Sequence, residues 1–237
     1  MNIEISLEDL LKNGSHFGHN KKRWNPKMDK FIYGEKNGTH ILDLRKSLPL
    51  IENALKFAHE SSKNKKKFLF VSTKKQHCEI VENIAKETNN YFVNFRWLGG
   101  MITNWNTVKN SINTLNNYEN ILNSEDTVFT KKELSDIEKK KIRLDKTLGG
   151  IVEMKSTPDV IFIIDTNREH IAVLEAKKLG IPIIGIVDTN CDPDLIDYPI
   201  PANDDGVKSV QFILDNFKKV IVQHDDTAME ESKIKNE

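Results

Sequence analysis

Residues 160–187 read VIFIIDTNREHIAVLEAKKLGIPIIGIV. The two ends of this stretch, 160–164 and 183–187, are apolar at every position except Gly185, a pattern typical of strands buried on both faces of a parallel sheet. Between them, 169–179 has the spacing of an amphipathic helix, and Gly180 follows where helices commonly end. The order strand, helix, strand therefore predicts an α/β fold.

Two shorter apolar runs, 68–71 and 91–93, repeat the pattern earlier in the chain. The segment 76–88 between them carries apolar residues along one helical face, and 206–223 predicts a final helix. Four strands separated by helices indicate a doubly wound parallel sheet covered on both faces, which makes three layers.

The N-terminal part has a different pattern. Ser6 is expected to begin a short helix, because a carboxylate follows three residues later, and 13–30 is expected to be a loop. An Asn-Gly pair in the middle of 31–42 predicts a β-hairpin. Ser47 is expected to cap the helix that follows.

A polar insert interrupts the α/β pattern. The segments 104–123 and 131–155 carry narrow apolar stripes at helical spacing, so we expect two antiparallel helices that project from the sheet. Leu-Gly-Gly occurs at 98–100 and again at 148–150. The two triplets are expected to mark where the chain leaves and re-enters the domain.

These patterns divide the chain into three parts. The α/β domain comprises 1–103 and 149–224, the helical insert 104–148 with its second helix continuing to about 155, and the charged, disordered tail 225–237.

Residues 96–105 read RWLGGMITNW, an unusual mixture after a strand. Arg96 and Trp97 suit phosphates and flat bases, while the glycines allow close approach of another backbone. A tight turn around a packed tryptophan explains the run equally well. Asn104 stands where the first helix of the insert needs a cap.

Charge is unevenly distributed along the chain. Lys+Arg and Asp+Glu number 35 each, but residues 1–150 hold 26 basic against 18 acidic residues, and 151–237 hold 9 against 17. This distribution favours a polyanion-binding side, although the acidic half also fits a protein-docking module. The chain shows no signal-peptide pattern, membrane-length apolar run or cysteine spacing of a disulfide framework, so we expect a soluble protein of a reducing compartment.

A basic loop follows the first helix. Four cations surround a tryptophan, an arrangement that suits phosphate neutralisation and base stacking in RNA binding. They are Lys21, Lys22, Arg23 and Lys27 around Trp24. A merely solvated loop is the alternative. His16 and His19 in the same loop could be metal ligands or ordinary packed side chains.

Two further groups suggest ligands. Asp188, Asp204 and Asp205 could hold a structural divalent cation, although turn and helix-cap roles explain them as well. The residues 72–75 follow a strand end, where doubly wound sheets bind phosphates, but no Walker or Gly-x-Gly-x-x-Gly loop is present. Because that position favours the hypothesis and the missing loops weaken it, a phosphate- or nucleotide-binding enzyme is the second hypothesis. No cofactor beyond a possible cation is expected.

Three separated stretches resemble the signatures of the ribosomal protein S2 family in its bacterial or organellar form. The first comprises LLKNGSHFGH at 10–19 with WNPKM at 24–28, and the second is RWLGGMITN at 96–104. The third runs from Pro158-Asp159 through DTN at 165–167 to Glu169, Glu175-Ala176 and GIP at 180–182.

The resemblance implies a flavodoxin-like domain with a protruding coiled-coil hairpin and no enzymatic activity. It implies a ribosome-bound monomer, cytoplasmic or organellar, on the solvent side of the small subunit at the head–body junction. Expected partners are small-subunit ribosomal RNA, ribosomal protein S1 and neighbouring small-subunit proteins, with no membrane. The expected RNA contacts are Lys21, Lys22, Arg23, Trp24, Lys27, Arg96, Trp97 and Asn104.

Overall fold

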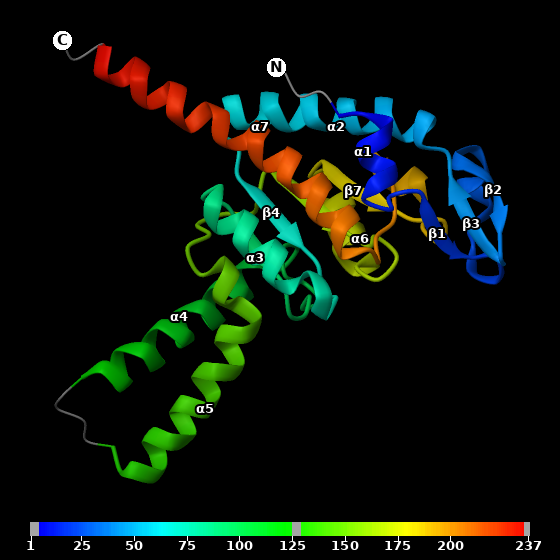
Figure 1. The fold of residues 1–237 in the computed structure, drawn as a ribbon. Helices are drawn as coiled ribbons and strands as arrows, with labels where there is room; N and C mark the ends of the chain where they lie inside the picture. Colours follow the sequence, from blue (N-terminus) through cyan, green and yellow to red (C-terminus); the bar gives the residue numbers. More distant parts are fainter. Residues whose placement is uncertain (1–4, 125–128, 235–237) are drawn as a thin grey trace.

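A five-stranded parallel sheet forms the centre of the protein in the computed structural model, which describes residues 5–124 and 129–234 (Figure 1). Its strands are β4 (Phe68–Val71), β5 (Tyr91–Val93), β6 (Val160–Ile164), β7 (Ile183–Val187) and β8 (Tyr198–Pro201). They lie in the order β5-β4-β6-β7-β8, all parallel. This is the flavodoxin-like order, in which the topology switches direction between β4 and β6. The predicted α/β class is confirmed.

Helices cover both faces of the sheet. On one face lie α2 (Leu44–Lys63), α3 (Cys78–Glu87) and α7 (Val207–Ile234), packed on Phe68, Phe70 and Phe162. On the other face α6 (His170–Leu179) packs on the alternate strand positions, including Leu69 and Ile161. Successive strand side chains point to opposite faces, so continuous apolar runs build two cores, as predicted.

The strand β8 was not predicted from the sequence. Its residues are Tyr-Pro-Ile-Pro, and proline cannot donate a ladder hydrogen bond. It is tolerated here because β8 is the edge of the sheet and pairs only with β7.

The N-terminal region forms α1 (Leu7–Lys12) and a second, antiparallel sheet of β1 (Phe17–Asn20), β3 (Thr39–Leu42) and β2 (Ile32–Lys36). The hairpin prediction is confirmed. Asn37 and Gly38 have φ of 53° and 78°, as a type I′ turn requires. The prediction of a loop over 13–30 missed β1, whose Phe-Gly-His-Asn lacks an alternating apolar pattern.

The start of α2 also differs from its prediction. Asp43, not Ser47, caps the helix, and its carboxylate accepts the backbone N–H of Arg45 at 3.1 Å. The Ser47 hydroxyl donates to the Asp43 carbonyl from inside the helix at 3.3 Å.

The insert consists of α4 (Trp105–Asn123) and α5 (Lys131–Leu148), which pack side by side and project from the sheet (Figure 1). An ion pair of 2.9 Å joins Glu119 to Lys141 between them. The expected continuation of the second helix to about 155 is wrong, because the chain turns at η4 (Gly149–Ile151) and packs on β5. Coiled-coil packing of the pair stays a prediction.

The final helix is longer than predicted. It runs to Ile234, so the disordered tail expected from 225 is wrong up to that residue, while 235–237 lie outside the described residues. No proline or glycine interrupts the sequence of the helix. Among the described helices, none has both the length and the apolar character to cross a membrane. Short 3-10 turns complete the fold: η1 (Lys21–Arg23), η2 (Pro26–Phe31), η3 (Lys75–His77) and η5 (Pro193–Leu195).

Candidate nucleic-acid interface and carboxylate cluster

The basic loop is held in a defined conformation next to the β-hairpin. Asn20 begins η1, with its side chain accepting the backbone N–H of Lys22 at 3.0 Å. The backbone N–H of Lys21 donates to the Gly38 carbonyl at 3.1 Å, and that of Asn25 to the Thr189 carbonyl at 2.7 Å. These bonds fasten the loop to the hairpin turn at one end and to the segment after β7 at the other.

The four cations of the loop differ in their availability. Lys21 pairs with Glu35 at 2.9 Å, and Lys27 contacts two carboxylates, those of Asp192 (2.7 Å) and Asp194 (3.2 Å). Lys22 and Arg23 are exposed and form no ion pair with any described residue. These two cations are therefore the most available for a phosphate.

Trp24 offers a partly open ring beside these cations. Its side chain is 36% exposed, and its ring lies against that of His40 with centroids 5.3 Å apart. The histidine contact limits the motion of the indole while leaving part of its surface accessible. An indole held in this way suits stacking on a base.

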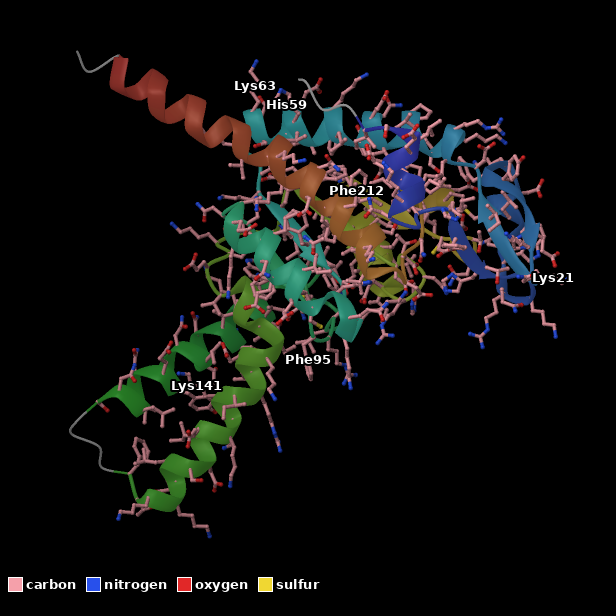
Figure 2. The ribbon with its side chains drawn as sticks, in the orientation of Figure 1. Lys21, His59, Lys63, Phe95, Lys141 and Phe212 are labelled. Atoms are coloured by element: carbon pink, nitrogen blue, oxygen red, sulfur yellow. The ribbon has the colours of Figure 1, made fainter. Side chains whose placement is uncertain are left out.

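The second predicted group, Arg96, Trp97 and Asn104, lies elsewhere on the molecule, near the start of the insert. Lys21 and Phe95, the neighbour of Arg96, mark the two separate regions in Figure 2. Arg96 and Asn104 are exposed. The Asn104 side chain accepts the Thr107 hydroxyl at 2.9 Å and makes no cap hydrogen bond to the backbone of α4.

Trp97 is a core residue, which corrects its prediction as an RNA contact. It is 7% exposed, and its indole N–H donates to the Glu175 carboxylate at 3.1 Å. The same carboxylate accepts the backbone N–H groups of Gly100 (2.7 Å), Ile102 (3.2 Å) and Thr103 (3.1 Å), and the Thr103 hydroxyl (3.0 Å). Burial alone would raise the pKa of Glu175, but these bonds to the ionised form outweigh it and lower the pKa.

Lys74, three residues after the end of β4, is surrounded by carboxylates at the carboxyl edge of the sheet. Its ammonium contacts three of them, those of Asp165 (2.7 Å), Asp204 (2.8 Å) and Asp205 (2.8 Å). Burial opposes the charge of Lys74, but the surrounding carboxylates outweigh that effect and raise its pKa. The ammonium therefore stays charged and balances part of the negative charge.

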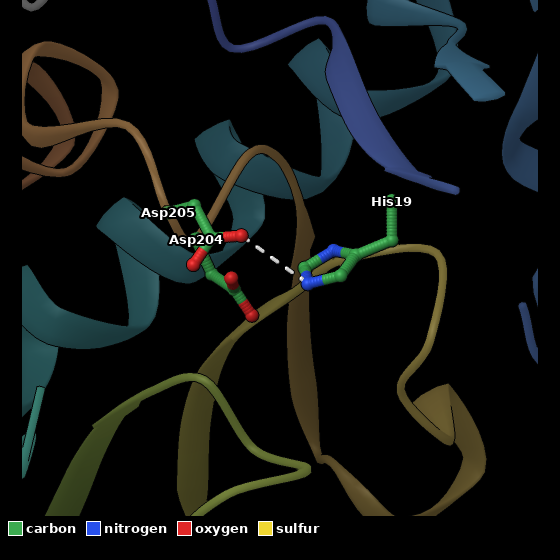
Figure 3. Close-up of side chains that lie close together, drawn as sticks. All are labelled: His19, Asp204 and Asp205. Carbon is green, nitrogen blue, oxygen red and sulfur yellow. Dashed lines mark ion pairs between the residues drawn. The ribbon is translucent and has the colours of Figure 1, made fainter. Parts of the chain in front are cut away.

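His19 of β1 completes the cluster (Figure 3). Its Nδ1 lies 3.0 Å from Asp188 and its Nε2 lies 3.2 Å from Asp205. The hydrogen bond with Asp188 raises the pKa of His19 above its ordinary value. Asp204 is fully buried, and its Oδ2 has no hydrogen-bond donor among the described residues. Burial raises the pKa of Asp204.

Candidate cation ligands in this cluster differ from the sequence-based set of Asp188, Asp204 and Asp205. Potential ligand atoms of His19, Asp204 and Asp205 lie within 4.8 Å of one another, whereas Asp188 holds the opposite nitrogen of His19. No local pattern in the sequence joins His19 to Asp204 and Asp205, which lie 185 and 186 residues further along the chain. A second group within the same distance comprises Asp165, Cys191 and Asp204.

The segment 72–75, the phosphate site of the enzyme hypothesis, forms hydrogen bonds and ion pairs within the protein. Glu169 accepts the backbone N–H of Thr73 at 2.9 Å and its hydroxyl at 2.5 Å. The ammonium of Lys74 is already bound by three aspartates. Two of the four residues at the topological switch point, Thr73 and Lys74, therefore use their donors within the protein.

Comparison with known proteins agrees with the three sequence signatures. Residues 10–224 match the family model described as "Ribosomal protein S2". The chain is 51% identical over 236 residues to "Small ribosomal subunit protein uS2" of Wolbachia pipientis subsp. Culex pipiens, covering 99% of this chain and 87% of that protein. It is 50% identical over 212 residues to the protein of the same name from Brucella ovis, covering 90% and 84%. With its sheet order and these matches, the chain belongs to the ribosomal protein S2 family.

Proposed function

We propose that the protein is a structural component of the small ribosomal subunit and binds small-subunit ribosomal RNA through its basic loop. The observation that carries the RNA contact is the pair of unpaired cations, Lys22 and Arg23, beside the partly exposed ring of Trp24. Phosphate neutralisation and stacking are the two interactions with which proteins bind unpaired RNA. The names of the relatives support the placement in the small subunit.

The finer placement rests on the family resemblance. From that resemblance we propose that the protein lies on the solvent side at the head–body junction, as a ribosome-bound monomer that supports subunit assembly and the docking of ribosomal protein S1. A sucrose gradient at moderate salt tests the association, since the protein should co-sediment with small subunits. Quantitative mass spectrometry of subunits lacking the protein should then show reduced S1.

The protein is not an enzyme. Homologues in the ribosomal protein S2 family are structural constituents of the ribosome. The internal use of Thr73 and Lys74 agrees with this role, because the sheet edge that serves nucleotide-binding enzymes is filled by Glu169 and the aspartates.

Salt-dependent binding tests the basic loop. For purified full-length protein on small-subunit ribosomal RNA, Lys22→Ala and Arg23→Ala should each reduce the slope of log affinity on log salt by about 0.7 to 0.9. Lys63→Ala, exposed at the end of α2, is the matched control and should leave the slope unchanged. Unchanged slopes in both loop variants would refute the assignment.

We also propose a divalent-cation site formed by His19, Asp204 and Asp205. Its support is the buried Oδ2 of Asp204, which has no donor among the described residues, next to a histidine whose Nδ1 lies 3.0 Å from Asp188. A carboxylate behind a ligating histidine is the usual arrangement at protein metal sites. Nitrogen and carboxylate donors fit zinc better than magnesium.

Thermal unfolding in the presence of metal tests this site. A cation that binds only the folded protein stabilises it, by about 2.7 kcal/mol when the free cation concentration is 100 times Kd. The melting temperature therefore rises with the cation concentration. Zn²⁺ should raise the melting temperature of the wild-type protein, and His19→Ala should abolish that increase. An equal increase in both proteins would show that the ion binds elsewhere.

A further inference from the structure

A hollow of about 520 Å³ lies beside the start of the insert, between the segment after β5 and the first turn of α6. Its volume is within the range of about 300–1,000 Å³ typical of sites for small organic groups. Phe95 is 57% exposed and Ile171 is 44% exposed, so the wall includes open apolar surface. Figure 2 shows Phe95 at the surface near the base of the insert.

Two guanidinium groups, of Arg96 and Arg168, line the same hollow. Arg96 makes no hydrogen bond or ion pair with the described residues, and it is exposed. Arg168 donates through Nε to the Thr73 hydroxyl at 2.9 Å, and its backbone N–H donates to Asp165 at 2.9 Å. Arg168 is therefore held in place, while the terminal nitrogens of its guanidinium have no partner among the described residues.

Among the described residues that line the hollow, Glu169 alone carries a carboxylate. It is 4% exposed, and its Oε1 accepts both the backbone N–H and the hydroxyl of Thr73. The hollow thus presents two positive charges and an exposed aromatic ring. A group that is both anionic and planar complements this surface.

The frame of the hollow is fixed before a ligand arrives. Trp97 forms part of the lining, and its indole N–H donates a hydrogen bond to the Glu175 carboxylate. The same carboxylate accepts backbone N–H groups from the segment 100–103. Phe95 and Arg96 immediately precede Trp97. Little ordering is then needed on binding, which favours affinity.

We infer that the hollow binds an unpaired nucleotide of ribosomal RNA, with its base on Phe95 and its phosphates on Arg96 and Arg168. The inference rests on the proposed function and adds a second RNA site, separate from the basic loop. Unpaired bases stacked on aromatic rings, with arginine at the phosphates, are a general mode of RNA recognition. An acidic protein segment is the competing occupant.

Variants of these residues in the full-length protein test the inference on a transcript of the small-subunit ribosomal RNA. The double variant Arg96→Gln, Arg168→Gln should reduce the slope of log affinity on log salt by about 1.4, the single-strand value for two phosphates. Phe95→Ala should weaken binding about fivefold to 150-fold with the slope unchanged. Phe95→Trp should bind like the wild type, because it keeps an aromatic face.

Lys178→Gln, exposed at the far end of α6, controls for a general loss of positive charge and should leave the slope unchanged. Melting curves equal to the wild type would show that the surface variants are folded. Cross-linking of RNA that contains 4-thiouridine should give an adduct on the peptide with Phe95.

Wild-type affinity and slope in both the Phe95 and the double-arginine variants would overturn the inference, and the basic-loop results would still decide the proposed function. If a neighbouring protein stays bound to the wild type after nuclease treatment but is lost from the double-arginine variant, and that variant still binds RNA normally, the hollow would be assigned to protein docking instead. Absence of RNA binding by the wild-type protein would overturn both proposals.

Discussion

Buried carboxylates are the residues that organise the carboxyl edge of the central sheet. Glu169 holds Thr73, Glu175 holds the segment after β5, and aspartates hold Lys74. An ionised carboxylate that accepts several N–H groups forms stronger hydrogen bonds than a neutral acceptor. The carboxylates at this edge therefore stabilise loops, including the segment that directly follows the proposed RNA contacts Phe95 and Arg96.

Replacing Glu175 by glutamine should destabilise the protein. The amide keeps one acceptor oxygen but puts an NH₂ group toward backbone donors, leaving at least one buried N–H unsatisfied, at a cost of about 2 kcal/mol. For a chain of this size the melting temperature should fall by about 4–8 °C. Glu138→Gln, exposed on α5, is the control. Equal melting temperatures for both variants and the wild type would contradict the role given to Glu175.

The lowered pKa of Glu175 also predicts a pH dependence of stability. Because its pKa is lower in the folded protein than in the unfolded chain, its contribution is complete above the unfolded pKa of about 4.3. That contribution is lost as pH falls through the folded pKa. Melting temperatures measured from pH 7 to pH 3 should therefore converge for wild type and Glu175→Gln at the acid end. A constant difference across the range would show that ionisation of Glu175 is not involved.

The sequence predicts the exposed site residues better than the buried ones. Lys22 and Arg23 are exposed, as expected for charged residues in a polar loop, because the local composition largely determines their exposure. Trp97 also follows an arginine but is buried, and its indole binds Glu175, which is distant in sequence. His19 meets Asp188 and Asp205 only through the tertiary fold. Pairings of this kind leave no local pattern.

At the scale of elements, strands with apolar runs were predictable, whereas the edge strands β1 and β8 were not. The strands β4, β6 and β7 are continuous apolar runs because helices cover both of their faces. The edge strands β1 and β8 carry glycine, histidine, asparagine or proline, because an edge requires fewer ladder bonds and less burial. Two helix boundaries differ from those predicted by the sequence pattern. The start of α2 is set by the Asp43 side-chain cap, and the end of α5 by the packing of η4 on β5.

The two Leu-Gly-Gly triplets should respond differently to substitution. A Cβ on Gly150 would overlap the Phe92 carbonyl oxygen, because η4 packs directly on β5, whereas a Cβ on Gly99 would meet no atom within 4 Å. Gly150→Ala should therefore destabilise the protein by about 1–3 kcal/mol or more through overpacking. Gly99→Ala should stay within about 0.5 kcal/mol of the wild type. Urea denaturation measures both, and equal values would refute the close packing of η4 on β5.

For the whole molecule, the described residues of the insert that join the core lie at the base of the insert. Val108 and Ile112 of α4 and Leu148 of α5 are buried with the residues of the second core. Beyond them, the described part of α5 has no fully buried side chain. The stability of the α/β domain should therefore depend on the base of the insert and hardly on its outer part.

A shortened insert tests this division. Replacing 120–140 by a Gly-Ser linker of about four residues, a usual length between paired helices, leaves Glu119 and Lys141 at the new tip. Because the removed part contributes little to the core, the melting temperature should change by less than about 4 °C, or about 1 kcal/mol. Ile112→Ala should cost about 2–5 kcal/mol, since it opens a cavity in the buried base. One substitution at the base should thus be more damaging than removal of the outer insert. The reverse order in thermal or urea unfolding would mean that the outer helices stabilise the sheet domain.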